Sequence, residues 1–137
     1  MTIREIMTTE VVSLQETDNM LDASMIFARS SLRHLPVLRD TVLVGVVTER
    51  DVKRFAPGLL SGVTSEQYNL ALETTAISRV MTRDPMTLKP EQEVIDAAEI
   101  FVSKRFGCLP VVDNGKLVGI VTRSNMLRLM VKMLKGE

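Results

Sequence analysis

Thr48 and Asp51 stand three positions apart, where an apolar segment typical of a strand passes into a segment typical of a helix. An aspartate accepts hydrogen bonds from two neighbouring hydroxyl groups at once, and a threonine hydroxyl donates or accepts beside it. Side chains projected from one rim in this way suit the vicinal diol of a ribose. The unpaired backbone amides of the helix start, with Arg50, Lys53 and Arg54 nearby, suit a phosphate. The segment is therefore a candidate site for an anionic ribose ligand.

The same spacing recurs at Thr122 and Asn125, but asparagine removes the charged acceptor. A second interpretation fits both pairs. Each threonine can be the N-cap of the helix that follows, and the residue three positions further on is then the N3 residue, where the helix dipole favours an acid. Asn125 suits that N3 position less well than Asp51 does. Cap and ligand roles are compatible, so both interpretations remain open for both pairs.

Few other residues could support catalysis or bind a metal. The sequence contains one histidine, His34, and one cysteine, Cys108, and it has neither a nucleophile with a base nor a glycine-rich phosphate loop. We therefore expect that the protein is not an enzyme. His34 could contact a phosphate or titrate near neutral pH, or it could simply be a half-buried packing residue. A pair of His34 and Cys108 lacks the further ligands that zinc needs, so we expect no metal.

Composition limits the partners of the chain. Lysine plus arginine equals aspartate plus glutamate at 17 each, so no overall charge attracts nucleic acid or an anionic membrane. Tryptophan is absent and there is one tyrosine, which leaves little for stacking on bases. The sequence shows neither a signal peptide nor an apolar stretch of membrane-spanning length, and a single cysteine fits a reducing compartment. These features predict a cytoplasmic protein that binds neither membranes nor nucleic acid.

The chain is an internal duplication. Displaced by 74 positions, residues 3–54 align with residues 77–128 without a gap, and 17 of the 52 positions are identical. The identical positions include the Met-Thr pairs at Met7 and Met81 and the Leu-Pro-Val triplets at Leu35 and Leu109. Two copies indicate a pseudo-symmetric pair of units.

Each copy predicts the same order of elements. A short strand at 11–14, or 86–88, precedes a helix whose buried face carries Met20, Ala23 and Phe27 in the first copy. Two apolar segments at 35–38 and 42–47 predict strands, and in the second copy they are separated by Asn114-Gly115, a strong hairpin signal. A helix that begins at Glu49 or Arg123 closes each unit.

The segment between the copies predicts a connector. Pro57-Gly58 ends the preceding helix, and Thr64 or Ser65 can cap a helix from about residue 64 to residue 72. We therefore expect a first domain at 1–56, a linker with a short helix at 57–76 and a second domain at 77–137. In the last helix, Met126, Met130 and Met133 form an apolar stripe that fits either the core or a homodimer surface.

The order of these motifs resembles the cystathionine β-synthase (CBS) domain family. Met-Thr, Leu-Pro-Val and Gly-x-x-Thr-x-x-Asp follow one another in the first copy, and the second copy repeats them with Asn125 in place of the aspartate. The resemblance covers almost the whole chain and implies an α/β (α+β) fold. It also implies two pseudo-symmetric β-α-β-β-α units packed through their sheets, with ligands in clefts between them.

Carried over by position, the resemblance implies the following site residues. The ribose would lie on Thr48 and Asp51. The base and phosphate side of that site would be formed by Thr82, Met86, Arg105, Phe106, Gly107 and Cys108. A weaker second site would join Thr122 and Asn125 to Thr8, Val12, Arg33 and His34.

The function implied is a regulatory module that senses an adenosine ligand, namely AMP, ADP, ATP or S-adenosylmethionine, and needs no cofactor. Without a catalytic domain in the sequence, it would act in trans on an unknown regulated protein, with a homodimer as its expected assembly. The alternative is a scaffold or dimerisation module that binds no ligand.

Overall fold

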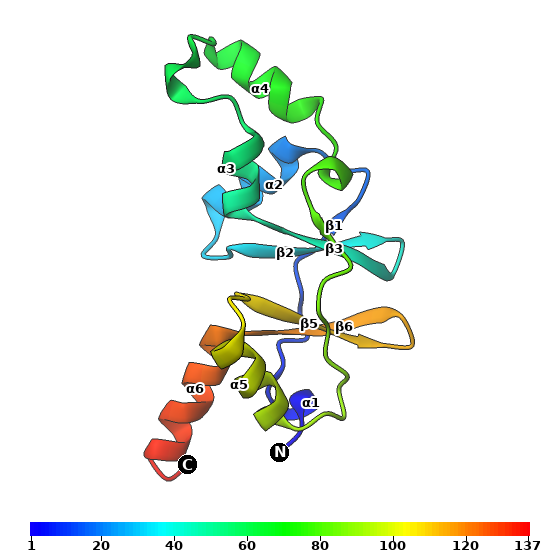
Figure 1. The fold of residues 1–137 in the computed structure, drawn as a ribbon, viewed down its shortest axis with the longest axis vertical. Helices are drawn as coiled ribbons and strands as arrows, with labels where there is room; N and C mark the ends of the chain where they lie inside the picture. The colour runs from blue at the N-terminus through cyan, green and yellow to red at the C-terminus, as the bar shows by residue number, and fades with distance from the viewer. The chain divides into compact units, whose positions relative to one another are not determined.

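The structure is a computed structural model of residues 1–137, and it describes all of them except the side chain of Leu59. The chain forms two compact units (Figure 1). We call Val12–Asp84 the central unit. Met1–Val11 and Pro85–Glu137 together form the terminal unit.

The central unit is a small mixed sheet with helices. The strands are β1 (Leu14–Gln15), β2 (His34–Arg39), β3 (Val42–Thr48) and β4 (Thr82–Arg83). The helices are α2 (Met20–Arg29), α3 (Glu49–Phe55) and α4 (Ser65–Glu73), with 3₁₀ turns at Leu59–Ser61 and Ile77–Arg79. Strand β1 is parallel to β2, β2 is antiparallel to β3, and β3 is antiparallel to β4.

The core of the central unit follows the predicted helical spacing. Met20, Ala23 and Phe27 are all buried, which confirms the predicted face of α2. They pack in one cluster with Val52 of α3 and Leu72 of α4. Removal of this apolar surface from water at about 25 cal/mol per Å² holds the helices against the sheet. Thr64 caps α4 by accepting a hydrogen bond from Gln67 N at 3.1 Å, as predicted.

The terminal unit repeats this plan in a reduced form. Its elements are α1 (Ile3–Ile6), α5 (Val94–Ser103), β5 (Cys108–Asp113), β6 (Lys116–Thr122) and α6 (Arg123–Leu134). Strands β5 and β6 form the predicted hairpin, and its turn places Asn114 and Gly115 at φ 52° and φ 80°. Asparagine and glycine adopt this left-handed region most readily, which explains the choice of residues.

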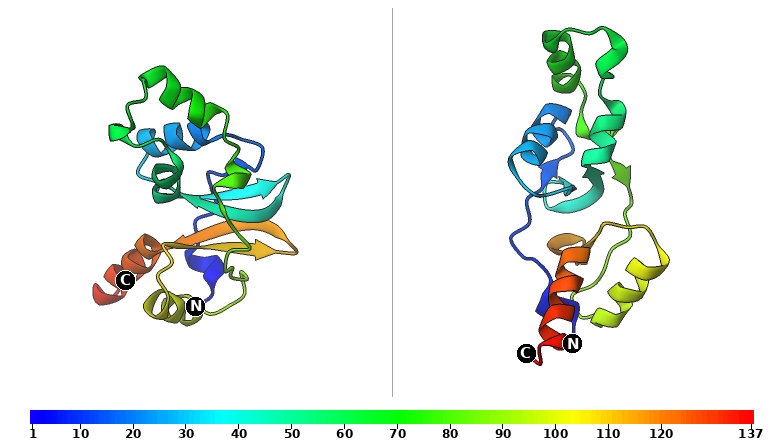
Figure 2. Two further views of the ribbon diagram at one scale, coloured as in Figure 1. Left: turned by 45° about the horizontal axis from the view of Figure 1, so that its top comes forward. Right: turned by 90° about the vertical axis from the view of Figure 1, so that its left-hand side faces the viewer.

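The opening segment of each repeat lies in the unit built by the body of the other repeat. Thr8 and Ile120 exchange two backbone hydrogen bonds of 2.9 Å, and α1 contacts α5 (Figures 1 and 2). In the central unit, Thr82 is the register partner of Val46. The compact units therefore cross the boundaries of the sequence repeats.

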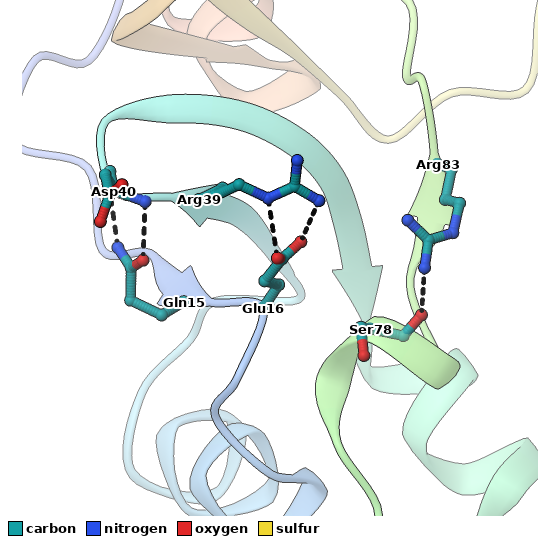
Figure 3. A network of polar contacts seen from close by, with 6 residues as sticks. All are labelled: Gln15, Glu16, Arg39, Asp40, Ser78 and Arg83. Atoms are coloured by element: carbon teal, nitrogen blue, oxygen red, sulfur yellow. Dashed lines mark hydrogen bonds and ion pairs between the residues drawn. The ribbon is translucent and has the colours of Figure 1, made fainter.

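A polar network fixes β1 to the turn between β2 and β3 (Figure 3). Gln15 and Asp40 exchange two hydrogen bonds of 3.0 and 2.9 Å. The Arg39 guanidinium donates to both carboxylate oxygens of Glu16, at 2.8 and 3.2 Å, and so lowers the pKa of Glu16. The equivalent pair in the second repeat is Pro90 and Asp113, which cannot form this ion pair.

Two predicted strands need correction, and the structure shows which methionines of the stripe in α6 contact the core. The strand predicted at 86–88 is reduced to a single bridge between Leu88 and Val111, and the strand predicted at 11–14 begins only at Leu14. In α6, Met126 packs against the core, but Met130 and Met133 are 49% and 65% exposed. The core interpretation of the methionine stripe therefore holds for Met126 alone.

Candidate functional site

The rim of the central unit is the junction of β3 and α3. Thr48 ends the strand and is the N-cap of the helix: its hydroxyl oxygen accepts from Asp51 N at 3.0 Å. Thr48 N in turn donates to Asp51 Oδ2 at 2.9 Å, which completes a capping box. Among the described residues, none donates a hydrogen bond to the other carboxylate oxygen, Asp51 Oδ1. The cap interpretation is thus confirmed, and one charged acceptor is left over.

The rim of the terminal unit has the same cap but a different outer contact. Thr122 donates to Asn125 Oδ1 from both its backbone N and its hydroxyl, each at 2.8 Å. Asn125 Nδ2 donates to Ile6 O at 3.1 Å and to Thr8 Oγ1 at 3.2 Å. Both ends of this amide therefore have partners within the chain.

The close approach of the Met-Thr segments explains the repeated glycines before these rims. A Cβ on Gly45 would lie 2.6 Å from Met81 Sδ and 2.8 Å from Thr82 O. A Cβ on Gly119 would lie 2.6 Å from Met7 Sδ and 3.0 Å from Thr8 O. The separations of 2.6 and 2.8 Å are shorter than real Cβ atoms adopt. A glycine at each position therefore lets the Met-Thr segment pass close to the strand.

Each predicted site draws residues from both units. Beside Thr48 and Asp51, the central unit contains Thr82, which is exposed in β4, together with Val12, Arg33 and His34. The terminal unit contains Thr122, Asn125 and Thr8, and also exposed Met86, Arg105 and Phe106, half-buried Gly107 and buried Cys108. The assembly of either complete site stays a prediction.

Strand register adds one neighbour to each rim that sequence reasoning missed. His34 is the register partner of Thr48, and Cys108 is the register partner of Thr122. Counting back from the hairpin turns could have found both pairs. Arg33 forms an ion pair with Glu49 of α3 at 3.4 Å, so its cation is already engaged beside the central rim.

Cys108 shows how burial sets chemistry here. Desolvation raises the pKa of its thiol to about 12, so the side chain is neutral at physiological pH. The part of the chain that the structure describes holds no cluster of three or more histidine, cysteine, aspartate or glutamate side chains able to bind a metal.

Comparison with known proteins identifies this arrangement. A model of the CBS domain matches residues 3–58 and again residues 77–132. The chain belongs to the CBS domain family. A CBS domain-containing protein of Dictyostelium discoideum is 32% identical over 108 residues, which are 77% of this chain and 74% of that protein.

Solved CBS structures share the fold. The chain resembles a putative acetoin utilization protein, AcuB, of Vibrio cholerae with a TM-score of 0.83 and 27% identity over 98% of this chain and 93% of the other. It also resembles CBSX2, a CBS-pair protein of Arabidopsis thaliana whose structure was determined in complex with AMP, with a TM-score of 0.79 and 28% identity over 96% and 97% of the two chains.

Other relatives are much longer. The chain spans 42% of an uncharacterized protein of Methanocaldococcus jannaschii and 24% of a homoserine O-acetyltransferase of Methanococcoides burtonii. Among the helices that the structure describes, none has both the length and the apolar character needed to cross a membrane.

Proposed function

We propose that the central rim binds an adenosine ligand of the AMP, ADP, ATP or S-adenosylmethionine class, with Thr48 and Asp51 gripping the ribose. The observation that carries this proposal is the spare oxygen Asp51 Oδ1, which accepts no hydrogen bond from the described residues while Oδ2 is held by the cap. A carboxylate oriented in this way is ready to accept from a ribose hydroxyl. The AMP complex of CBSX2, a similar CBS-pair protein, supports the ligand class.

The base and phosphate side belongs to the same proposal. Exposed Met86 and Phe106 offer apolar surface for a purine face, and the exposed guanidinium of Arg105 suits a phosphate. Thr82, Gly107 and Cys108 complete this side, where Cys108 would act as a neutral, buried wall.

The proposed role is regulatory and in trans, on a partner protein not yet identified. The chain matches only a quarter of the homoserine O-acetyltransferase, whose activity belongs to that longer protein. We infer that this chain itself is not an enzyme. A cytoplasmic location, suggested by the single cysteine, is part of the same proposal.

The proposed assembly is a homodimer through the helices of the terminal unit. Helix α5 exposes Ile95 and Val102 on one face together with Glu99. Helix α6 exposes Leu127, Met130 and Leu134 next to basic side chains at 128 and 132. An acidic apolar face and a basic apolar face on one unit are complementary in a two-fold pair. Sedimentation at several protein concentrations would test this assembly.

A scaffold that binds no ligand is the second candidate. The terminal rim favours it, because the Asn125 amide is fully occupied by the chain itself. A dimer whose thermal stability is unchanged by every adenosine ligand would support the scaffold over the sensor.

Isothermal titration with AMP, ADP, ATP and S-adenosylmethionine tests the sensor directly. Asp51→Ala should weaken binding by about 10- to 100-fold, because hydrogen bonds to a charged acceptor contribute about 1.5 to 3 kcal/mol. Glu49→Ala is the matched control, since it removes a carboxylate from the same helical turn. Equal affinities for Asp51→Ala and the wild type would exclude the proposed ribose grip.

A further inference from the structure

The Asn125 side chain bridges two parts of the terminal unit that are more than one hundred residues apart in sequence. Its carbonyl oxygen lies 2.8 Å from both donors of Thr122, and its amide nitrogen lies near two acceptors of the N-terminal segment, Ile6 O and Thr8 Oγ1. The partners determine the orientation of the amide. Thr122 N can only donate and Ile6 O can only accept, so a flipped amide would face like groups.

An aspartate could not make this bridge. A carboxylate has no hydrogen to donate, so an oxygen in the place of Nδ2 would lie about as close to Ile6 O as that nitrogen does, with two negative atoms facing each other. The central unit shows the consequence. Asp51 forms its cap with Thr48, and among the described residues it makes no hydrogen bond to Val80 or Thr82, the counterparts of Ile6 and Thr8.

The bridge acts on a segment that other contacts also hold. Backbone hydrogen bonds join Ile3 N to Gln92 O, Arg4 N to Pro90 O and Val94 N to Met1 O, and Ile6 and Met7 pack against the core. Thr8 and Ile120 exchange two backbone hydrogen bonds, and Ile3 is fully buried in the core. The ion pair of Arg4 with Glu91 is exposed and contributes little. At residues 6–8, the half-buried Asn125 thus adds two side-chain hydrogen bonds to the two backbone hydrogen bonds of Thr8 and to the packing of Ile6 and Met7.

We propose that Asn125 is the specificity-determining residue of the terminal rim: it commits that rim to holding the chain's own N-terminal segment, Met1–Val11, in place of a ribose. The chain then has one ribose-binding rim, Thr48 with Asp51. The statement that only one rim binds ribose, the ligand half of the proposal, rests on the proposed function. The statement that Asn125 holds the N-terminal segment, the holding role, does not. In this proposal, the weaker second site predicted from sequence is a structural contact and not a ligand site.

Hydrogen exchange on the ligand-free protein tests the holding role. Asn125→Asp keeps Thr122 as the N-cap and an acceptor at N3 for the capping box, so α6 should still form, but it removes the donor to Ile6 and Thr8. We expect the amides of Thr8 and Ile120 to exchange about tenfold faster, the effect of losing hydrogen bonds of typical strength. Asn125→Ala should act in the same direction, and Ser124→Ala, an exposed neighbour in the same turn, should not. Unchanged exchange at both amides in both Asn125 variants would overturn the holding role.

Titration with AMP tests the ligand half. The wild type should bind one AMP per chain, and Asn125→Asp should bind two, because the new carboxylate is released from the N-terminal segment. Two sites in the wild type, or one site in both proteins, would overturn this half. If AMP does not bind at all, the proposed function fails and the ligand half fails with it, but the exchange rates still decide the holding role.

Discussion

The two rims have the same cap and differ in the hydrogen bonds that the residue three positions after the threonine can form. In both, a threonine at the end of a strand caps the next helix and forms a capping box with the residue three positions on. In the central rim that residue is Asp51, an acceptor with one oxygen unused by the cap. In the terminal rim it is Asn125, whose donor reaches Ile6 and Thr8. A change of one atom, from oxygen to nitrogen, thus separates a rim whose carboxylate has an oxygen unused by the cap from a rim whose amide is bonded to its own chain.

The helices of the two units also differ in how deeply their apolar side chains are buried. Helix α2 contacts α3 and α4, and Val52 of α3 and Leu72 of α4 are buried. None of the described residues of α6 is fully buried: Met126 and Leu129 pack partly against the core, and Leu127, Met130 and Leu134 are exposed. Helices α3 and α4 thus each contribute a buried side chain to the core of the central unit, whereas α6 contributes only partly buried side chains to the core of the terminal unit.

The largest expected effect tests whether both rims need a glycine at the point where a Met-Thr segment passes close to the strand. Gly45→Ala should lower the free energy of unfolding by about 2 to 3 kcal/mol, because the new Cβ meets the backbone oxygen of Thr82 at 2.8 Å. Gly119→Ala should cost somewhat less, since Thr8 O lies 0.2 Å further away, at 3.0 Å. Urea denaturation measures both. Gly58→Ala is the control, as nothing lies within 4 Å of its Cβ position, and a cost there equal to that of Gly45→Ala would contradict the steric account.

The second prediction isolates the charge that distinguishes the rims. Asp51→Asn should weaken AMP binding by about tenfold, because a neutral acceptor replaces a charged one of nearly the same shape. The midpoint of urea denaturation should hardly change, since asparagine also supports the cap, as Asn125 does. Titration calorimetry measures the affinity. A loss of folding stability that matches the loss of affinity would attribute the effect to the cap and not to the ligand.

The third prediction compares the caps themselves. Thr48→Ala and Thr122→Ala should each lower the free energy of unfolding by about 1 kcal/mol, the usual cost of losing an N-cap. Thr122→Ala should cost slightly more, because its hydroxyl also donates to Asn125 Oδ1 at 2.8 Å. The difference is read from paired denaturation curves. A reversed order would show that Thr122 does not support the Asn125 bridge.

The smallest effect concerns the ion pair that only the central unit has. Arg39 lowers the pKa of Glu16, so folding favours the charged carboxylate, and this contribution is present above the unfolded pKa near 4.5. It is lost as the pH falls through the lowered pKa of the folded state. Arg39→Met should therefore reduce the urea midpoint slightly at pH 7 and less at pH 3. Lys116→Met, at an exposed strand position, serves as the control, and an equal loss at both pH values would rule out the ion pair as the cause.

Much of the local structure could be predicted because its determinants are close in sequence. The spacing of Met20, Ala23 and Phe27 predicts the buried face of α2, and Asn114-Gly115 predicts the turn between β5 and β6. The two caps are contacts between residues three positions apart, so the spacing of Thr48 and Asp51 was enough to expect them. The resemblance of the ordered motifs added the CBS family, which the family match confirms.

The sequence by itself determined the duplication, the order of the longer helices and strands, and the two capping pairs, because these depend on periodicity and on short-range hydrogen bonds. Only the tertiary structure decided that residues 1–11 join residues 85–137, and that Asn125 binds Ile6 and Thr8. Contacts between such distant positions depend on how the chain returns to itself, and no local pattern of residue types encodes that path. The sequence therefore shows that the rims differ at Asp51 and Asn125, and only the folded chain shows what Asn125 contacts.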